Sequence, residues 1–171
     1  FSLKNNTLFS EEFDDFYSSV KGAVAECNHV FIKGNNLNER FENLEENSKF
    51  YIGEIGFGIG INFLTTCKSW LSHTKQNQVL EFYSFDKYLF RLRDFKKLNV
   101  SCPDLKEYIS ELELSYPRNI QGVQKISLFD GRIILNLIIG EIDSTQEYIK
   151  LMNKVDAWYL DGFSPSKNPD L

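Results

Sequence analysis

The stretch "YIGEIGFGIGINFLTTCKSW", residues 51–70, decides the fold of this chain. Its four glycines lie within eight positions of one another: Gly53, Gly56, Gly58 and Gly60. The apolar run over 50–55 predicts a buried strand, and apolar residues at helical spacing over 60–71 predict an amphipathic helix. A strand, a glycine loop and a helix in this order are typical of a nucleotide-binding turn, because glycine lets a ligand approach the backbone closely.

Strands and helices alternate along the rest of the chain. The remaining predicted elements are a strand over 79–85 closed by Asp86, helices over 89–98, 101–114 and 143–154, a hairpin over 122–139 turning at Asp130-Gly131, and a strand over 155–160 ending at Asp161. This alternation predicts an open α/β sheet, mostly parallel and flanked by helices.

The N-terminal part is predicted as a separate segment. "HVFIKGNNLNERF" (29–41) combines an apolar run with turn residues at Gly34-Asn35-Asn36 and then alternates apolar and polar residues, which predicts a β-hairpin. A polar connector follows over 42–49. We therefore expect an N-terminal segment, 1–49, whose hairpin packs on a main domain, 50–171.

Composition limits the class of protein. The 171 residues are 42% hydrophobic and 15% aromatic, which excludes disorder, and no apolar run is long enough to span a bilayer. Cys27, Cys67 and Cys102 are widely spaced, which favours free thiols in a reducing cytoplasm over a disulfide framework or a metal site. The net charge of −5 argues against a free-standing nucleic-acid binder.

Three polar features are expected at one edge of the sheet. The carboxyl ends of parallel strands bind ligands in such folds, and the glycine loop, Asp86 and Asp161 all fall there. The spacing is G-x-G-x-G, with Asn62 near the place of a later small residue, whereas dinucleotide sites have G-x-G-x-x-G. Glu54 would repel a pyrophosphate and favour a cation. This pattern indicates S-adenosylmethionine, with Asp86 accepting hydrogen bonds from the ribose hydroxyls.

A second group of residues lies in "DAWYLDGFSPSKNPDL" (156–171). An Asp followed closely by Pro, with aromatic residues nearby, is similar to the loop of methyltransferases that act on amino groups. An alkylamine has a pKa of about 10 and must lose a proton before it attacks a methyl sulfonium. Asp161 is a candidate to orient the amine and accept its hydrogens, or else it caps the next element. Lys167 is either a phosphate contact or a solvated charge.

Several motifs together resemble one family. "GEIGFGIGINFL", "FDKYLFRLRDF", "KVDAWYLDGFSPSKNPDL" and the N-terminal "FDDFY" are similar to the methyltransferase half of the bifunctional bacterial enzymes that make 5-methylaminomethyl-2-thiouridine at the tRNA wobble position. The resemblance implies a Rossmann-like class I methyltransferase fold. It also implies methyl transfer from S-adenosylmethionine to the aminomethyl group of the wobble uridine of tRNA, with no metal and no membrane partner.

The resemblance also implies roles for individual residues. Asp161 is the catalytic residue, next to the substrate amine. The implied cofactor-binding residues are Glu54, Gly56, Gly58, Gly60, Asn62, Asp86, Lys87, Glu141 and Asp161. The implied substrate-binding residues are Asp15, Tyr17, Phe163, Pro165 and Lys167. The family more often has Glu at the position of Asp86 and Asp at that of Glu141.

Two further expectations follow from the family pattern. In the family a flavin oxidoreductase domain, which binds FAD, usually follows and prepares the amine, and no flavin-domain glycine motif is present here. Sheets of this kind normally continue to about seven strands, so the sheet is expected to be incomplete in this sequence. Two alternatives stay open: a methyltransferase for a small-molecule or protein amine, and a non-catalytic dinucleotide-binding domain.

Overall fold

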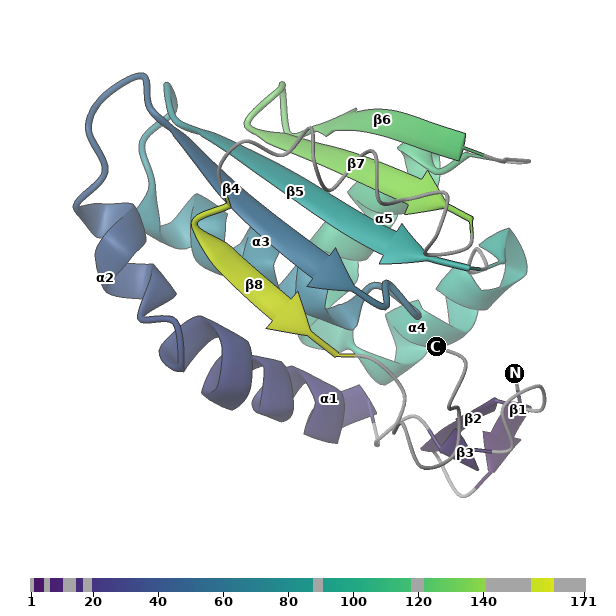
Figure 1. Ribbon diagram of the computed structural model, residues 1–171. Coiled ribbons are helices and arrows are strands. Elements are labelled where there is room, and N and C mark those ends of the chain that lie inside the picture. The colour runs from purple at the N-terminus through teal and green to yellow at the C-terminus, as the bar shows by residue number, and fades with distance from the viewer. Residues whose placement is uncertain are drawn as a thin grey trace.

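A five-stranded sheet with helices packed on one face forms the body of the protein (Figure 1). The computed structural model describes residues 2–4, 7–10, 15–16, 20–87, 91–117, 122–140 and 155–161. The strand order is β6-β7-β5-β4-β8. The strands are β4 (Lys49–Ile55), β5 (Val79–Asp86), β6 (Gly122–Leu128), β7 (Ile133–Ile139) and β8 (Ala157–Leu160).

The sheet is mostly parallel, as predicted. Strand β4 pairs in parallel with β5 and β8, and β5 pairs in parallel with β7, whereas β6 is antiparallel to β7. The chain moves from β4 through β5 to β7 on one side and then returns to place β8 on the other side of β4. This reversal of direction between β4 and β8 is the place where open α/β sheets bind ligands.

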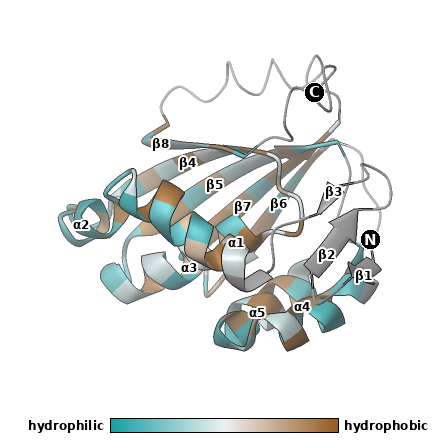
Figure 2. Ribbon diagram, turned by 90° about the horizontal axis from the view of Figure 1, so that it is seen from below, coloured by the Kyte–Doolittle hydropathy of each residue, from teal (hydrophilic) through white to brown (hydrophobic). Residues whose placement is uncertain are grey.

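Helices cover one face of the sheet (Figure 2). They are α1 (Val20–Cys27), the π-helical turn η1 (Asn28–Lys33), α2 (Leu37–Glu42), α3 (Ile61–His73), the 3-10 turns η2 (Leu92–Asp94) and η3 (Pro103–Leu105), α4 (Phe95–Ser101) and α5 (Lys106–Ser115). The predicted helix over 60–71 is confirmed as α3. The predicted helix over 143–154 lies outside the described residues.

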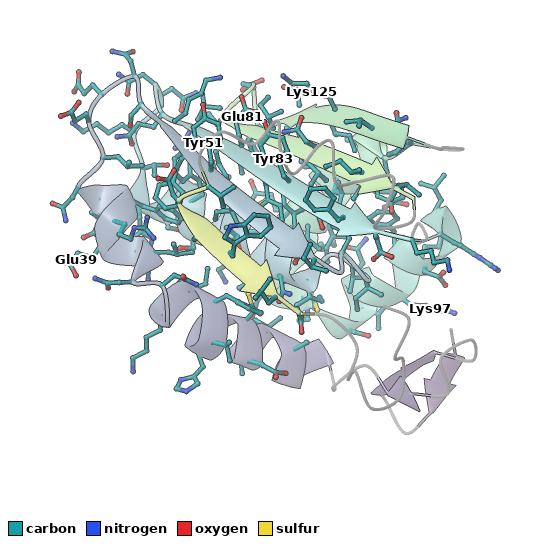
Figure 3. All side chains as sticks on the ribbon, in the orientation of Figure 1. Glu39, Tyr51, Glu81, Tyr83, Lys97 and Lys125 are labelled. Carbon is teal, nitrogen blue, oxygen red and sulfur yellow. The ribbon has the colours of Figure 1, made fainter. Side chains whose placement is uncertain are left out.

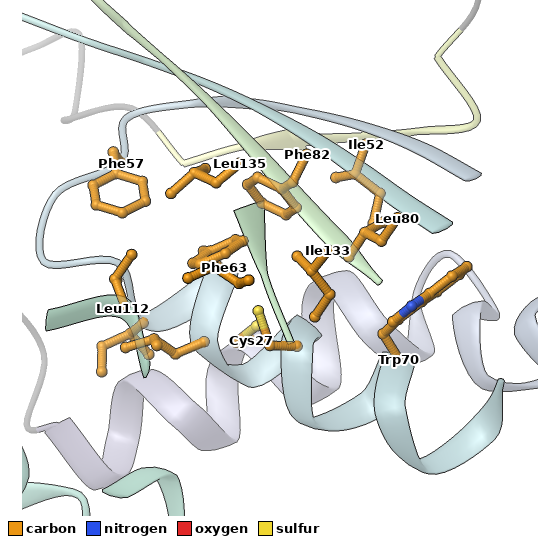
Figure 4. Packing of buried hydrophobic residues seen from close by; sticks show 14 of the residues in the cluster. Cys27, Ile52, Phe57, Phe63, Trp70, Leu80, Phe82, Leu112, Ile133 and Leu135 are labelled. Atoms are coloured by element: carbon orange, nitrogen blue, oxygen red, sulfur yellow. The ribbon is translucent and has the colours of Figure 1, made fainter. Parts of the chain in front are cut away.

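The hydrophobic core lies between this helical layer and the sheet (Figure 4). Alternate residues of β4 and β5 point into it, including Ile52, Leu80 and Phe82, and Phe63 of α3 packs edge-on against Phe82 with ring centroids 5.1 Å apart. Trp70, near the end of α3, is fully buried. Burying side chains of this size contributes roughly 1.5–3 kcal/mol each to stability.

Gly53 has a packing role that differs from that of the other three glycines. It lies within β4, directly opposite Trp158 of β8. A Cβ atom at Gly53 would lie only 2.5 Å from the nearest atom of the Trp158 ring. The glycine therefore allows the indole to lie against the backbone of β4, and Gly53 is not part of the loop that follows the strand.

The predicted β-hairpin over 29–41 is wrong, because these residues form η1 and α2. The turn at Gly34-Asn35-Asn36 is present, and Asn36 has a positive φ of 52°. However, Asn36 precedes the first turn of a helix rather than connecting two strands. Leu37 and Phe41, which fit an alternating strand, fit an i, i+4 helical face equally well, and both are fully buried.

The hairpin over 122–139 is confirmed, but its turn is longer than predicted. Leu128 pairs with Ile133, so residues 129–132 connect the strands in place of a two-residue turn. Phe129, Asp130 and Gly131 all have positive φ values, of 51°, 54° and 84°. The Asp-Gly pair thus supplies left-handed backbone, as its chemistry predicts, within a four-residue loop.

The N-terminal segment does contain strands, but they lie within residues 2–16 and not within the predicted hairpin over 29–41. Strands β1 (Ser2–Lys4), β2 (Thr7–Ser10) and β3 (Asp15–Phe16) form a small antiparallel sheet. Phe31 of η1 stacks on Tyr159 of β8 with ring centroids 4.5 Å apart, so residues before β4 contribute to the main core. The domain division at residues 49 and 50 stays a prediction.

Candidate functional site

The loop after β4 has a backbone that glycine is best suited to adopt. Gly56, Gly58 and Gly60 have φ values of 92°, 54° and 78°, in the left-handed region that side chains with a Cβ avoid. The third of these glycines is the residue that precedes the first turn of α3. The glycine-rich sequence therefore bends the chain sharply from the end of β4 into α3.

The amide groups of these glycines are already bonded within the protein. Gly56 donates to the Phe85 carbonyl, Gly60 donates to the Phe57 carbonyl, and Gly58 donates to Oδ2 of Asp86, each over 2.8 Å. A dinucleotide turn instead directs backbone N–H groups at a pyrophosphate. Here the three N–H groups are bonded within the protein, and the carboxylate of Asp86 accepts one of them in place of a ligand phosphate. The loop therefore suits a positively charged ligand.

Asp86 is held at the carboxyl end of β5, beside the glycine loop. Its carboxylate accepts the bond from Gly58, and its carbonyl accepts a bond of 3.0 Å from the amide of Gly140 after β7. This placement fits the predicted role of Asp86 as an acceptor for hydroxyl groups of the cofactor.

Asp161 is connected to the same loop through Asn62. Asn62, in the first turn of α3, donates from Nδ2 to Oδ2 of Asp161 over 2.7 Å. The amide of Asp161 donates to the carbonyl of Ile55 over 3.3 Å, which fixes the end of β8 beside the end of β4. The glycine loop, Asp86 and Asp161, which are far apart in sequence, thus meet at one edge of the sheet.

Glu54 lies beneath this edge and is fully buried. Its Oε2 accepts a 2.5 Å bond from the hydroxyl of Ser84 on β5, and Oε1 has no hydrogen-bond partner among the described residues. Burial raises the pKa of Glu54 to about 8, against the opposing effect of hydrogen bonding from Ser84 and Asn62. The nearby carboxylates of Asp161 and Asp86 act in the same direction as burial.

A buried polar network supports Asn62 from below. The carbonyl of Asn62 accepts a bond of 2.7 Å from the hydroxyl of Thr66, which also bonds with the hydroxyl of Tyr159 over 3.0 Å. The thiol of Cys27 lies 3.8 Å from the same carbonyl. Ser84, Thr66 and Tyr159 were not identified from the sequence as part of the site. The only sign of their role in the sequence is that each places a polar group on an otherwise apolar face of a strand or helix.

The other predicted site residues are placed only in part. Lys87 follows Asp86 and is exposed, while Asp15 belongs to β3. The remaining predicted cofactor and substrate contacts lie outside the described residues: Tyr17, Glu141, Phe163, Pro165 and Lys167. Their roles stay predictions.

Replacing Gly60 by alanine should destabilise the protein more than the same change at Gly122. Both glycines have positive φ, but a Cβ at Gly60 would lie 2.9 Å from the buried Phe57 ring, whereas a Cβ at Gly122 would contact nothing within 4 Å. The backbone cost alone is about 1 kcal/mol, and the forced shift of Phe57 adds about 1–2 kcal/mol. Urea unfolding of the two variants measures the difference, and equal losses of stability would contradict the role of Phe57.

Neither a metal site nor a membrane span is found in the part of the chain that the structure describes. Groups of three or more potential metal ligands do not occur there. Helices long and apolar enough to cross a membrane do not occur there either.

Comparisons with known proteins agree with this geometry. The family model of S-adenosyl-L-methionine-dependent methyltransferases matches residues 103–171. Curated relatives named tRNA 5-methylaminomethyl-2-thiouridine biosynthesis bifunctional protein MnmC match nearly the whole chain. The protein from Hydrogenovibrio crunogenus is 40% identical over 162 residues, which cover 95% of this chain and 24% of the relative. The protein from Leptospira interrogans serovar Lai is 40% identical over 169 residues, which cover 98% of this chain and 26% of the relative.

A solved structure supports the fold. The crystal structure of MnmC2 from Aquifex aeolicus aligns with a TM-score of 0.66 and 22% identity, covering 95% of this chain and 48% of that chain. This chain spans about a quarter of the length of the curated relatives that it matches. The similarities confirm the resemblance that the motifs indicated and the Rossmann-like fold that it implied.

Proposed function

We propose that this chain, a relative of the S-adenosyl-L-methionine-dependent methyltransferases, methylates the aminomethyl group of 5-aminomethyl-2-thiouridine at the wobble position of tRNA. One observation carries the proposal most directly: at the switch point of the sheet, the glycine loop is hydrogen-bonded to Asp86 through Gly58, and the first turn of α3 is hydrogen-bonded to Asp161 through Asn62. The names of the relatives, which refer to biosynthesis of this modified nucleoside, support the choice of substrate.

The described residues fit this cofactor better than they fit a dinucleotide. S-adenosylmethionine carries a sulfonium, an ammonium and a ribose diol, and it has no phosphate. The edge of the sheet offers the carboxylates of Asp86 and Asp161, and the amides of three loop glycines are bonded internally. This donor and acceptor set suits a cation with hydroxyl groups, and it disfavours the alternative of a dinucleotide-binding domain.

The chain's own residues would position the reacting amine. When bound, S-adenosylmethionine supplies an electrophilic methyl group. Asp161, held in place by Asn62, accepts hydrogen bonds from the substrate amine and orients its lone pair toward the methyl carbon. With the cofactor bound, Asp161 or water would take the proton that the amine nitrogen loses on methylation.

Partners and location follow from the same proposal. The relatives are named bifunctional, and we expect a separate flavin oxidoreductase unit, which uses FAD, to produce the amine. A tRNA substrate and three free thiols are consistent with a cytoplasmic protein. Because the net charge is −5, we expect tRNA to be held by a local basic surface or by another unit.

Transfer of a labelled methyl group tests the proposal. The protein is incubated with labelled S-adenosylmethionine and tRNA that carries the unmethylated aminomethyl group, and in parallel with free alkylamines and with lysine-rich peptides. We expect label in tRNA only, at the wobble nucleoside. Label in free amines or peptides alone would favour the second candidate, a methyltransferase for small-molecule or protein amines. Binding of NAD without binding of S-adenosylmethionine would overturn both methyltransferase candidates, the one for tRNA and the one for other amines.

A further inference from the structure

Glu54 is a buried carboxyl group for which the methyl-transfer mechanism has no use. Resting on the proposed function, we propose that Glu54 selects the cationic methyl donor over its neutral by-product, S-adenosylhomocysteine. It releases its proton to solvent when the donor binds, and it takes a proton back once only the by-product remains. Glu54 is a specificity-determining group in this scheme and does not touch the transferred methyl group.

The position of Glu54 supports this role. It is fully buried just before the glycine loop, its Oε2 accepts a bond from Ser84, and the side chain of Asn62 lies close enough to act as a second donor to the carboxyl group. Oε1 is buried without a hydrogen-bond partner in the described part of the chain. A buried acceptor without a partner is costly and therefore uncommon, so its presence points to a ligand or a proton.

The titratable groups near Glu54 are either acids, whose negative charge disfavours ionisation of Glu54, or neutral groups. The acids are Asp86 at the end of β5 and Asp161 after β8. Cys27 of α1 and Tyr159 of β8 also lie nearby, and burial raises the pKa of Cys27 to about 12 and that of Tyr159 well above its usual value. Both therefore stay neutral near pH 7, and no ion pair to Glu54 occurs among the described residues.

Burial raises the pKa of Glu54 to about 8, so the carboxyl group is mostly protonated near pH 7. A cation bound next to Glu54 lowers the pKa of its carboxyl group again, because an opposite charge favours the ionised form. The two ligands share the same ammonium and carboxylate and differ by the sulfonium charge. The donor should therefore bind more tightly as the pH rises toward 8, by at most about tenfold per pH unit, and the by-product should not.

Calorimetry in buffers with different ionisation enthalpies tests this coupling, because it counts the protons released on binding. S-adenosylmethionine and S-adenosylhomocysteine are titrated into the wild-type protein, Glu54→Gln and Glu81→Gln between pH 6 and 8.5. Gln at position 54 keeps an acceptor for Ser84 and is as neutral as the protonated Glu, so the fold should be retained. Glu81 is the matched control. It is another buried strand carboxylate, but it pairs with Lys49 over 2.8 Å on the opposite face of the sheet (Figure 3).

At pH 7 we expect the wild-type protein and Glu81→Gln to release more protons with the donor than with the by-product, by up to one per site. In Glu54→Gln this difference should vanish, and the ratio of the two affinities should become independent of pH. Equal proton release for both ligands in the wild-type protein would overturn the inference, even if Glu54→Gln failed to fold. Failure of both ligands to bind would instead overturn the proposed function itself, and the Glu54 assignment with it.

Discussion

Replacing Asp86 by alanine should weaken binding of S-adenosylhomocysteine by about 100-fold or more. Hydrogen bonds to a charged group contribute about 1.5–3 kcal/mol each, and the proposed site uses this carboxylate for two ribose hydroxyls. The change also removes the acceptor for the amide of Gly58, so the glycine loop loses one of its bonds to β5 and keeps the one from Gly56 to Phe85. Isothermal titration of the wild-type protein and the variant measures the loss.

Two further variants separate cofactor binding from damage to the loop. Asp86→Asn keeps an acceptor for Gly58 and should preserve the melting temperature, but it replaces one acceptor oxygen by a donor and should still lose about tenfold or more in affinity. Glu107→Gln, which neutralises an exposed acid on α5, should leave binding unchanged. Unaltered affinity in Asp86→Ala would exclude Asp86 from the cofactor site.

Replacing Asp161 by alanine should lower kcat for methyl transfer by about 10²–10⁴-fold, the usual contribution of a positioned acid or base. Affinity for S-adenosylhomocysteine should fall much less than in Asp86→Ala, because the main role assigned to Asp161 is at the substrate amine. Single-turnover transfer of labelled methyl groups to tRNA, combined with titration of the by-product, measures the two effects separately.

The partner of Asp161 provides the control for this prediction. Asn62→Ala removes the 2.7 Å bond that orients Asp161 but leaves the carboxylate in place. We expect an intermediate loss of kcat in Asn62→Ala, smaller than that in Asp161→Ala. If Asp161→Ala and Asp86→Ala reduced cofactor affinity equally, the assignment of separate roles to the two carboxylates would fail.

The central strands and the helix after the glycines were predictable because their signals are local. The run over 50–55 is apolar except at Glu54, and the helix over 61–73 has apolar residues at a helical period. The structure of the segment over 29–41 was not predictable from local signals, because Leu37 and Phe41 fit both the alternation of a strand and the periodicity of a helix. Packing of Phe41 against Phe50 and Trp70, with ring centroids 5.0 and 4.9 Å away, favours the helix, and such contacts are invisible in a local window.

The meeting of the glycine loop, Asp86 and Asp161 was predictable from topology, since the carboxyl ends of parallel strands share an edge. The sequence did not indicate that Asn62 would bond directly to Asp161, because that bond depends on β8 lying next to β4. Nor did it indicate the complete burial of Glu54 or its pairing with Ser84. These features depend on the register between strands, which a pattern of residue types does not specify.

The position of β4 between β5 and β8 affects the order in which the protein assembles on the ribosome. Residues of β5 follow those of β4 closely in synthesis, whereas the contact between Tyr51 and Asp156 spans 105 residues. One edge of β4 therefore stays open in the nascent chain until β8 emerges, and open strand edges attract other chains. The bond between Asn62 and Asp161, 99 residues apart, forms only after that step, so the candidate site is complete later than most of the sheet that carries it.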